Sequence, residues 1–456
     1  MDFTTRPELR GTFGMVASTH WLASAVGMSV LEKGGNAFDA AAAAGFTLQV
    51  VEPHQNGPLG DMPVIFWSER DKQARVVCGQ GPAPAAATIE AYRDLGLDLV
   101  PGTGLLAAVI PGAVGGWLAL LSEYGTLPLA DILGPAIGYA RGGYPVAPML
   151  NVYINNVKAL FEEAWPTSQA LYLQGGGVPA VGSLFSNPEL ADFYQRLLTE
   201  AEAAGGDREK QIEAARRAFY EGFVAETIEG FCRDNEVLDS SGRRHKGLLT
   251  AEDMAGWRAG FEDPLSYDYH GHTIFKTGPW GQGPAALQTL ALAKGFDFDA
   301  MDPAGPDFVH TLVECLKLAY ADREAWYGDP NFVDVPIEHL LSEPYNEARR
   351  KLIGAEASLE LRPGAVPGRE LRLPASVDSV PAGALATGPG VGEPNAAAAQ
   401  LASSGEVASD TVHVNVADRW GNLVSAMPSG GWLQSSPVIP GIGAPLGTRA
   451  QMYWLE

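Results

Sequence analysis

The sequence contains few positive charges, few cysteines and no long uninterrupted apolar run. Its 31 Lys and Arg are outnumbered by 54 Asp and Glu, and the formal net charge of −23 at pH 7 excludes a basic nucleic-acid-binding protein. The three cysteines, Cys78, Cys232 and Cys315, are widely spaced and form no CxxC pair, so a reducing compartment is expected. Neither a signal-peptide core nor a run of about 18 apolar residues occurs. We therefore expect a cytoplasmic protein that binds neither nucleic acid nor membrane.

Motifs of several common enzyme classes are also missing. The sequence has no GxSxG nucleophile elbow, no P-loop, no HExxH pair and no dinucleotide fingerprint after a strand. His310, Glu314 and Asp322 are spaced along one predicted helix and are candidate metal ligands, but a metal site normally recruits a second clear cluster of ligands. We interpret these three residues as polar helix-packing groups, and we expect neither a metal nor an organic cofactor.

Helical and strand-like patterns occur together along the chain. Hydrophobic residues make up 46% of it, which is enough for sizeable cores. Ser18 and Thr19 are predicted to cap a helix in HWLASAVGMSVLEK that ends at Gly34, and MPVIFW and ARVVCG are typical of short buried strands. The run TVHVNVADRWGNLVSAM predicts a β-hairpin with its turn at 418–422. These patterns alone indicate only an α/β or an α+β fold.

The composition changes sharply after the predicted helices. Residues 363–410 are rich in Pro, Gly, Ala and Ser and contain almost no aromatic residues, which is typical of a mobile linker. We therefore divide the chain into a large region, 1–362, a linker, 363–410, and the start of a smaller region, 411–456.

A strand that begins with a threonine directly after this linker allows two interpretations. In the first, the Thr411 hydroxyl attacks the carbonyl of Asp410, and hydrolysis of the resulting ester frees the Thr411 α-amine. Nucleophile and general base would then lie on one residue. In the second, Thr411 is an ordinary strand residue selected for β-propensity. The local pattern alone favours the second interpretation.

Several longer segments resemble the gamma-glutamyltranspeptidase family of N-terminal-nucleophile hydrolases. They are GMVASTHWLASAVGMSVLEKGGNAFDAAAAAGFTLQVVEPHQNG, GPAPAAAT, IPGAVGGWLAL, GLLTAEDMAGW, HTLVECLKLAYADREAWYGDPNFVDVP and DTVHVNVADRWGN. They occur in the family's order from Gly14 to the last residues of the chain. The resemblance implies a four-layered α/β/β/α sandwich, in which two stacked antiparallel sheets are flanked by helices. This fold belongs to the α+β class.

The resemblance also implies site residues and an activity. Thr411, the first residue of the family's T-x-H pattern, corresponds to the autoprocessing and catalytic nucleophile, and Ser429 corresponds to a hydroxyl residue beside it. The implied reaction is hydrolysis or acyl transfer through an acyl-enzyme, without a cofactor. The substrate would be a small-molecule amide, peptide-like or γ-glutamyl. Large and small subunits would arise from one precursor, and a homo-oligomer is compatible with the resemblance.

The chain departs from the family pattern where the amino-acid part of the substrate would bind. Leu106 falls at the position of an arginine that pairs with the substrate α-carboxylate. Gly431 falls at an expected asparagine, and the expected aspartate falls near Gln451 or Met452. These departures suggest an alternative, an acylase for a group without the amino-acid head, such as a glutaryl-type amide.

The end of the chain departs as well. In the family, further strands and a Gly-Gly oxyanion hole follow the position of GTRAQMYWLE, so Gly430 and Gly431 are the candidates to supply those donors from within this chain. A truncated or processing-dead homologue without catalysis is the remaining alternative.

Overall fold

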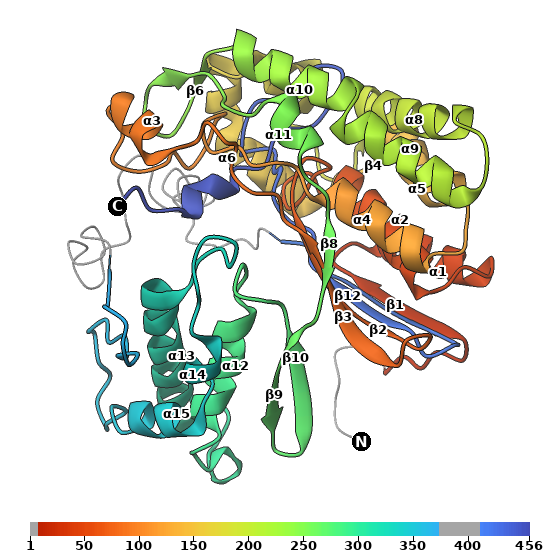
Figure 1. The fold of residues 1–456 in the computed structure, drawn as a ribbon. Helices are drawn as coiled ribbons and strands as arrows, with labels where there is room; N and C mark the ends of the chain where they lie inside the picture. The colour runs from red at the N-terminus through yellow and green to blue at the C-terminus, as the bar shows by residue number, and fades with distance from the viewer. Residues whose placement is uncertain (1–7, 374–410) are drawn as a thin grey trace. The chain divides into compact units, whose positions relative to one another are not determined.

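A computed structural model describes residues 8–373 and 411–456 of the chain (Figure 1). These residues form two compact units. The larger contains 8–73, 77–262 and 411–455, and the smaller contains 74–76, 263–373 and Glu456. Most of the predicted linker, together with Asp410, lies outside the described residues.

A six-stranded sheet in the order β1-β11-β12-β2-β3-β8 lies at the centre of the larger unit. The pairs β1–β11, β11–β12 and β12–β2 are antiparallel. The hairpin that follows Thr411 is therefore inserted between two strands from the beginning of the chain. The strands are β1 (Gly14–Ser18), β2 (Met62–Ser68), β3 (Gln73–Gly79), β8 (Gly260–Glu262), β11 (Val414–Asp418) and β12 (Leu423–Ala426).

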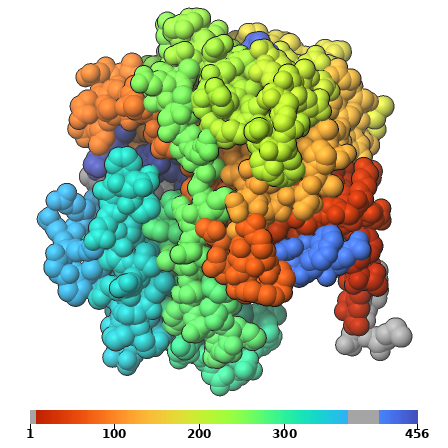
Figure 2. All heavy atoms as spheres, turned by 45° about the vertical axis from the view of Figure 1, so that its right-hand side comes forward, coloured from red at the N-terminus to blue at the C-terminus, as the bar shows by residue number. Residues whose placement is uncertain are grey.

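The predicted hairpin is confirmed, with its turn where the sequence indicated it. The Asp418 carboxylate accepts hydrogen bonds from the backbone N–H groups of Trp420 and Asn422, and Gly421 supplies the positive φ of 96°. In Figure 2 the hairpin tip, in blue, lies between the orange turn after β2 and the red N-terminal segment. Asn422 ties these turns together, because its side-chain oxygen accepts a hydrogen bond from Glu69 N, 3.0 Å away.

Helices α1 (Trp21–Glu32) and α2 (Ala37–Val51) pack on this sheet. Gly34 (φ 94°) supplies the expected positive φ just after the end of α1, but the expected N-cap is wrong. His20 is the N-cap, with its ring Nδ1 accepting a hydrogen bond from Leu22 N at 3.2 Å. Thr19 instead donates its hydroxyl hydrogen to the Glu52 carboxylate at 2.5 Å.

Nine further helices and two short strand pairs complete the larger unit. The strand pairs are β4 (Tyr144–Pro145) with β5 (Leu184–Phe185), and β6 (Val237–Leu238) with β7 (Arg244–His245). The helices, counted over the described residues, are α3 (Ile89–Asp94), α4 (Ala113–Tyr124), α5 (Leu129–Gly142), α6 (Pro148–Glu163), α7 (Pro166–Tyr172), α8 (Pro188–Ala203), α9 (Arg208–Tyr220), α10 (Phe223–Asp234) and α11 (Ala251–Ala255).

The smaller unit pairs a hairpin with a set of helices. Its elements are β9 (Leu265–Tyr269), β10 (His272–Lys276), α12 (Gly283–Ala293), α13 (Pro306–Trp326), α14 (Ile337–Leu340) and α15 (Glu343–Arg350). On α13, Glu314 is paired with Lys317 and Arg362, and Asp322 with Arg349. These contacts agree with the packing interpretation of the acidic residues on this helix.

The start of the predicted linker is anchored to the smaller unit. Gly364 N donates to Asp322 Oδ1 at 2.7 Å, and the Val366 side chain packs with Leu340 and Tyr345 in a small apolar cluster. The linker as a whole stays a prediction, because residues 374–410 are outside the described part of the chain.

The α+β class predicted from the resemblance is confirmed. Within residues 8–373 and 411–456, one six-stranded sheet and three two-stranded sheets occur, so the second large sheet of a four-layered sandwich stays a prediction. In the same residues, no helix combines the length and the apolar character that crossing a bilayer requires.

Candidate active site

Thr411 and Ser429 lie side by side, as the resemblance implied. The two residues form an antiparallel bridge just outside the β11–β12 hairpin, in which Val412 N donates to Pro428 O at 3.2 Å. Their side-chain oxygens, Thr411 Oγ1 and Ser429 Oγ, are 3.1 Å apart. The hairpin therefore brings two side chains that are 18 residues apart in the sequence within hydrogen-bond distance.

Ser429 is also held from its other side by the loop before β2. Its N–H donates to Asp61 O at 2.9 Å, and Asp61 N–H donates to Ser429 O at 2.8 Å. Both residues are buried: Ser429 is 3% exposed and the Asp61 side chain is 4% exposed. The backbone at Ser429 is thus fixed by Thr411 and Asp61 together.

A guanidinium group contacts this hydroxyl pair. Arg449 donates from Nη2 to Ser429 Oγ at 2.6 Å and from Nε to Asp61 Oδ1 at 2.9 Å. Asp61 Oδ2 accepts a further hydrogen bond from Gln80 Nε2 at 3.1 Å, and the guanidinium lies over the Trp432 ring, 4.7 Å from its centroid. The result is a continuous polar chain from Gln80 to Thr411.

Gly430 and Gly431 form a tight turn directly after Ser429. Both have positive φ, 70° and 63°. A Cβ on Gly430 would lie 2.5 Å from Asp61 Oδ1, and one on Gly60 would lie 2.1 Å from Ser429 O. Only glycine fits this close approach of two loops. The two glycines directly follow Ser429 in the chain and pack against the Gly60–Asp61 loop, and their role as oxyanion donors stays a prediction.

Leu106 is placed differently from the other predicted site residues. Its side chain is 2% exposed and belongs to an apolar cluster that includes Tyr92 and Leu97, and its carbonyl accepts a hydrogen bond from Tyr92 Oη at 2.8 Å. Ala450, the residue after Arg449, belongs to the same cluster, and its N–H donates to Ala107 O at 3.1 Å. A direct contact of Leu106 with substrate stays a prediction.

Gln451 and Met452, which aligned with the family's amino-acid clamp, differ in their surroundings. The Gln451 amide, oriented so that its nitrogen donates, reaches Gly102 O at 2.6 Å, while Met452 is 52% exposed. His413 of the T-x-H pattern pairs its Nε2 with Ser425 Oγ at 3.1 Å across the hairpin. In the described part of the chain, this histidine supports the strand that follows Thr411.

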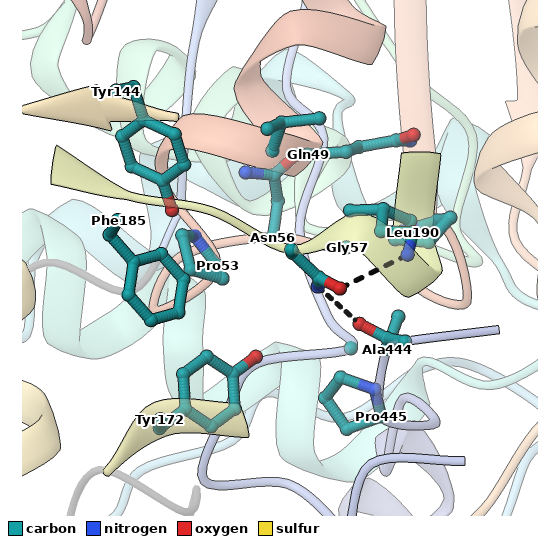
Figure 3. A pocket seen from close by; sticks show the side chains of 15 residues that line it. Gln49, Pro53, Asn56, Gly57, Tyr144, Tyr172, Phe185, Leu190, Ala444 and Pro445 are labelled. Atoms are coloured by element: carbon teal, nitrogen blue, oxygen red, sulfur yellow. Dashed lines mark hydrogen bonds between the residues drawn. The ribbon is translucent and has the colours of Figure 1, made fainter. Parts of the chain in front are cut away.

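Gly431 is one of the residues that line a small cavity, which Figure 3 shows from close by. Tyr144, Tyr172 and Phe185 form one wall, and burial raises the pKa of both tyrosines, which keeps the phenols neutral. Tyr144 Oη and the buried side-chain atoms Gln49 Nε2 and Asn56 Oδ1 have no hydrogen-bond partner among the described residues. None of the described residues that line this cavity carries a charge that could anchor a carboxylate.

Two buried titratable groups follow α2. Burial lowers the pKa of His54 to about 3, with a smaller contribution from His20, and His54 is 1% exposed. Burial also raises the pKa of Glu52, although the Thr19 hydroxyl partly offsets this. His54 is thus a neutral core residue, 5.1 Å from the Tyr153 ring between centroids.

The roles of Asp61 and Arg449 in this site were not found from the sequence. The two residues are 388 positions apart, and no periodic pattern connects them. The available signal was an aspartate in the glycine-rich loop GPLGDM, directly before a predicted buried strand.

A family model described as gamma-glutamyltranspeptidase matches residues 23–455. The glutathione hydrolase-like YwrD proenzyme of Bacillus subtilis is 34% identical over 346 residues, which are 75% of this chain and 61% of that protein. The acylase ACY 1 proenzyme of Pseudomonas sp. (strain SE83) is 31% identical over 97% of this chain and 70% of its own length. A solved structure of LmbA2991HD is 51% identical, with a TM-score of 0.90 over 100% of this chain and 74% of that one. The chain thus spans about three fifths to three quarters of the length of these relatives.

Proposed function

This chain belongs to the gamma-glutamyltranspeptidase family, and from that membership we propose that it is an autoprocessed threonine amidohydrolase or acyltransferase. The observation that carries the proposal is the 3.1 Å contact between Thr411 Oγ1 and Ser429 Oγ, just outside a hairpin whose two strands both pair with further strands of the sheet. Relatives of the chain are named as proenzymes, which supports a cleavage step as part of the function.

The proposed processing step uses the Thr411 hydroxyl as nucleophile. Oγ1 attacks the carbonyl carbon of Asp410, the Asp410–Thr411 C–N bond breaks, and the nitrogen takes a proton to become the α-amine. Water then hydrolyses the ester and restores the hydroxyl. The mature residue carries both nucleophile and base, because an α-amine with an ordinary pKa of about 8 accepts protons near neutral pH.

The proposed catalytic cycle repeats this chemistry on a substrate. Thr411 Oγ1 attacks an amide carbonyl while its proton passes to the α-amine, which then protonates the leaving amine. Water or another amine releases the acyl group from Thr411. Gly430 and Gly431 are proposed to supply N–H donors to the oxyanion, since they follow Ser429 directly and adopt conformations that side chains would prevent.

The surroundings favour an acyl group without an α-amino acid head. Leu106 is buried among apolar side chains, Gly431 carries no side chain, and the Arg449 charge is already paired with Asp61. Such a substrate would be a glutaryl-type amide, in keeping with an acylase among the relatives. A γ-glutamyl amide is the second candidate, because other relatives are named glutathione hydrolases.

Two matched anilides separate these candidates. Glutaryl-p-nitroanilide and γ-L-glutamyl-p-nitroanilide differ only in the α-amino group. Both compounds carry the same carboxylate, so the comparison isolates the ammonium, which costs about 1–3 kcal/mol or more where it enters a site without a hydrogen-bond partner. We expect kcat/KM for the glutaryl compound to be about tenfold or more higher. A higher value for the γ-glutamyl compound would assign the chain to the second candidate.

Cleavage is proposed to leave one assembly that contains both products. The hairpin β11–β12 pairs with β1 on one side and β2 on the other, so its departure would expose two unpaired strand edges. The fragments should therefore elute together in gel filtration.

We further propose the four-layered arrangement for the whole fold, a cytoplasmic location and a small-molecule amide substrate. A wild-type chain that never cleaves and hydrolyses neither anilide would support the non-catalytic alternative.

A further inference from the structure

Arg449 contacts Ser429 of the hydroxyl pair, and the hydrogen bonds of its guanidinium have a fixed direction. A guanidinium has only donors, so in the 2.6 Å contact with Arg449 Nη2 the oxygen of Ser429 must be the acceptor. The Ser429 hydroxyl hydrogen takes no part in that contact, and Thr411 Oγ1 lies 3.1 Å away. An oxygen that already accepts from a cation is a better donor and a poorer second acceptor, which favours donation from Ser429 to Thr411.

We propose that Arg449 is a positioning residue that fixes Ser429 as the hydrogen-bond donor to Thr411 Oγ1. This inference rests on the proposed function of Thr411 as the nucleophile. Without the guanidinium, the Ser429 hydroxyl could rotate and accept from Thr411 as readily as donate to it, since the distance alone allows either direction.

Besides its contact with Ser429, the guanidinium is held in place by Asp61 and Trp432. Asp61 Oδ1 accepts from Nε at 2.9 Å, and the Asp61 carboxylate is itself fixed by Gln80 Nε2 on its second oxygen. The fully buried Trp432 ring lies against the guanidinium face. With 19% exposure of the Arg449 side chain and 4% of Asp61, the ion pair is poorly screened by water. A lysine could not reproduce these simultaneous contacts, because it has a single nitrogen.

Asp61 couples the position of Arg449 to that of Ser429. The same residue exchanges two backbone hydrogen bonds with Ser429 and one side-chain ion pair with Arg449. The distance between the guanidinium and the serine hydroxyl is therefore set by one short loop. This arrangement is a built site rather than a chance contact between two exposed side chains.

The chemical role follows from the proton movements during acylation. The Oγ1–H bond of Thr411 breaks, its proton moves to the α-amine, and a bond forms between Oγ1 and the acyl carbon. Ser429 keeps its own proton throughout and donates a hydrogen bond to the charge that develops on Oγ1. Arg449 strengthens this donor because it accepts no proton and withdraws charge from Ser429 Oγ.

A double-mutant cycle on the full chain tests the inference. Ser429→Ala removes the donor, and Arg449→Gln removes the charge and keeps an amide of similar reach. Each should lower kcat for the preferred anilide by about 10- to 100-fold with a much smaller change in KM, as expected for a lost donor to a developing charge. If Arg449 acts through Ser429, the double variant should be no slower than Ser429→Ala alone. Arg449→Lys should recover only part of the loss.

Matched variants control for folding and for processing. Arg216→Gln removes another poorly exposed arginine of the larger unit, which pairs with Glu213 and Glu221, and it should leave kcat unchanged. Rates are divided by the fraction of chain cleaved before Thr411, measured on a denaturing gel. If Arg449→Gln does not fold, Asp61→Asn replaces it in the cycle, because it releases the guanidinium without removing it.

The outcomes separate this inference from the proposed function. If the fold-losses in kcat of the two single variants multiply in the double variant, Arg449 does not act through Ser429. That result would overturn the role of Arg449 and leave Thr411 as the nucleophile. A higher KM with an unchanged kcat in Arg449→Gln would also overturn it, since Arg449 would then bind the substrate and not position Ser429. A wild-type chain that hydrolyses no amide would reject the proposed function, and the inference with it.

Discussion

His54 is predicted to make the fold sensitive to mild acid. The imidazole is 1% exposed, and burial holds its pKa at about 3, whereas an unfolded histidine has a pKa near 6.5. Between these values the unfolded chain binds a proton that the folded chain does not. The stability from this group is therefore fully present above pH 6.5 and is lost as the pH falls toward 3.

The size of the effect follows from the shift. One pKa unit corresponds to about 1.4 kcal/mol, so at pH 5 His54 should reduce the stability by about 2 kcal/mol relative to pH 8. Glu52 has the opposite sign, because its raised pKa makes the folded state bind the extra proton. Its contribution is present below the ordinary pKa of a glutamate and is lost as the pH rises, so it opposes the loss from His54.

The assay observes the imidazole directly. Selective labelling of the histidine Cε1 positions gives one resonance for each of the eight histidines, and His54→Gln identifies the signal of His54 by its absence. That signal should not titrate between pH 8 and pH 5, while exposed histidines should. The melting temperature of His54→Gln should also fall less than that of the wild type over this range. A His54 signal that titrates between pH 6 and 7 would refute the reasoning.

Two further substitutions test the packing around the site. Gly430→Ala should destabilise the chain by about 1–3 kcal/mol and lower turnover, because its Cβ would lie 2.5 Å from Asp61 Oδ1 at a φ of 70°. Gly138→Ala on α5, with no atom within 4 Å of the added Cβ, should be neutral or stabilising in the same thermal melts; equal melting temperatures for the two variants would contradict this. Leu106→Arg should destabilise the fold by about 3 kcal/mol or more, since an unpaired guanidinium would enter an apolar cluster. Leu106→Met should be tolerated, and a stable Leu106→Arg variant that gains γ-glutamyl hydrolysis would show that this side chain reaches the substrate.

Local chemistry explains which parts of the fold could be predicted. The alternating β-branched residues and the Asp-to-Asn turn identified the β11–β12 hairpin, because both signals act within a few residues. The pairing of β11 with β1 could not be predicted in this way, since it joins Gly14 to Asp418. The cap of α1 was missed because histidine is not a common N-cap residue.

The candidate site was predictable to a similar extent. The resemblance supplied Thr411 and Ser429, and the hairpin geometry brings these two together. The Asp61–Arg449 pair was out of reach, because it depends on two distant loops that meet only in the folded chain. Leu106 shows the limit of the resemblance. The alignment with the family matched Leu106 to a substrate-binding arginine, but an alignment does not say whether the side chain at that position faces the site.

The free amine of Thr411 is the feature that the account most depends on. Intact-mass analysis with N-terminal sequencing of the purified wild type measures it directly. The account predicts two polypeptides, of which the C-terminal one begins Thr-Val-His-Val, while Thr411→Ala remains a single chain with the mass of the precursor. An uncleaved wild-type chain, or cleavage before residue 411 that persists in Thr411→Ala, would contradict it.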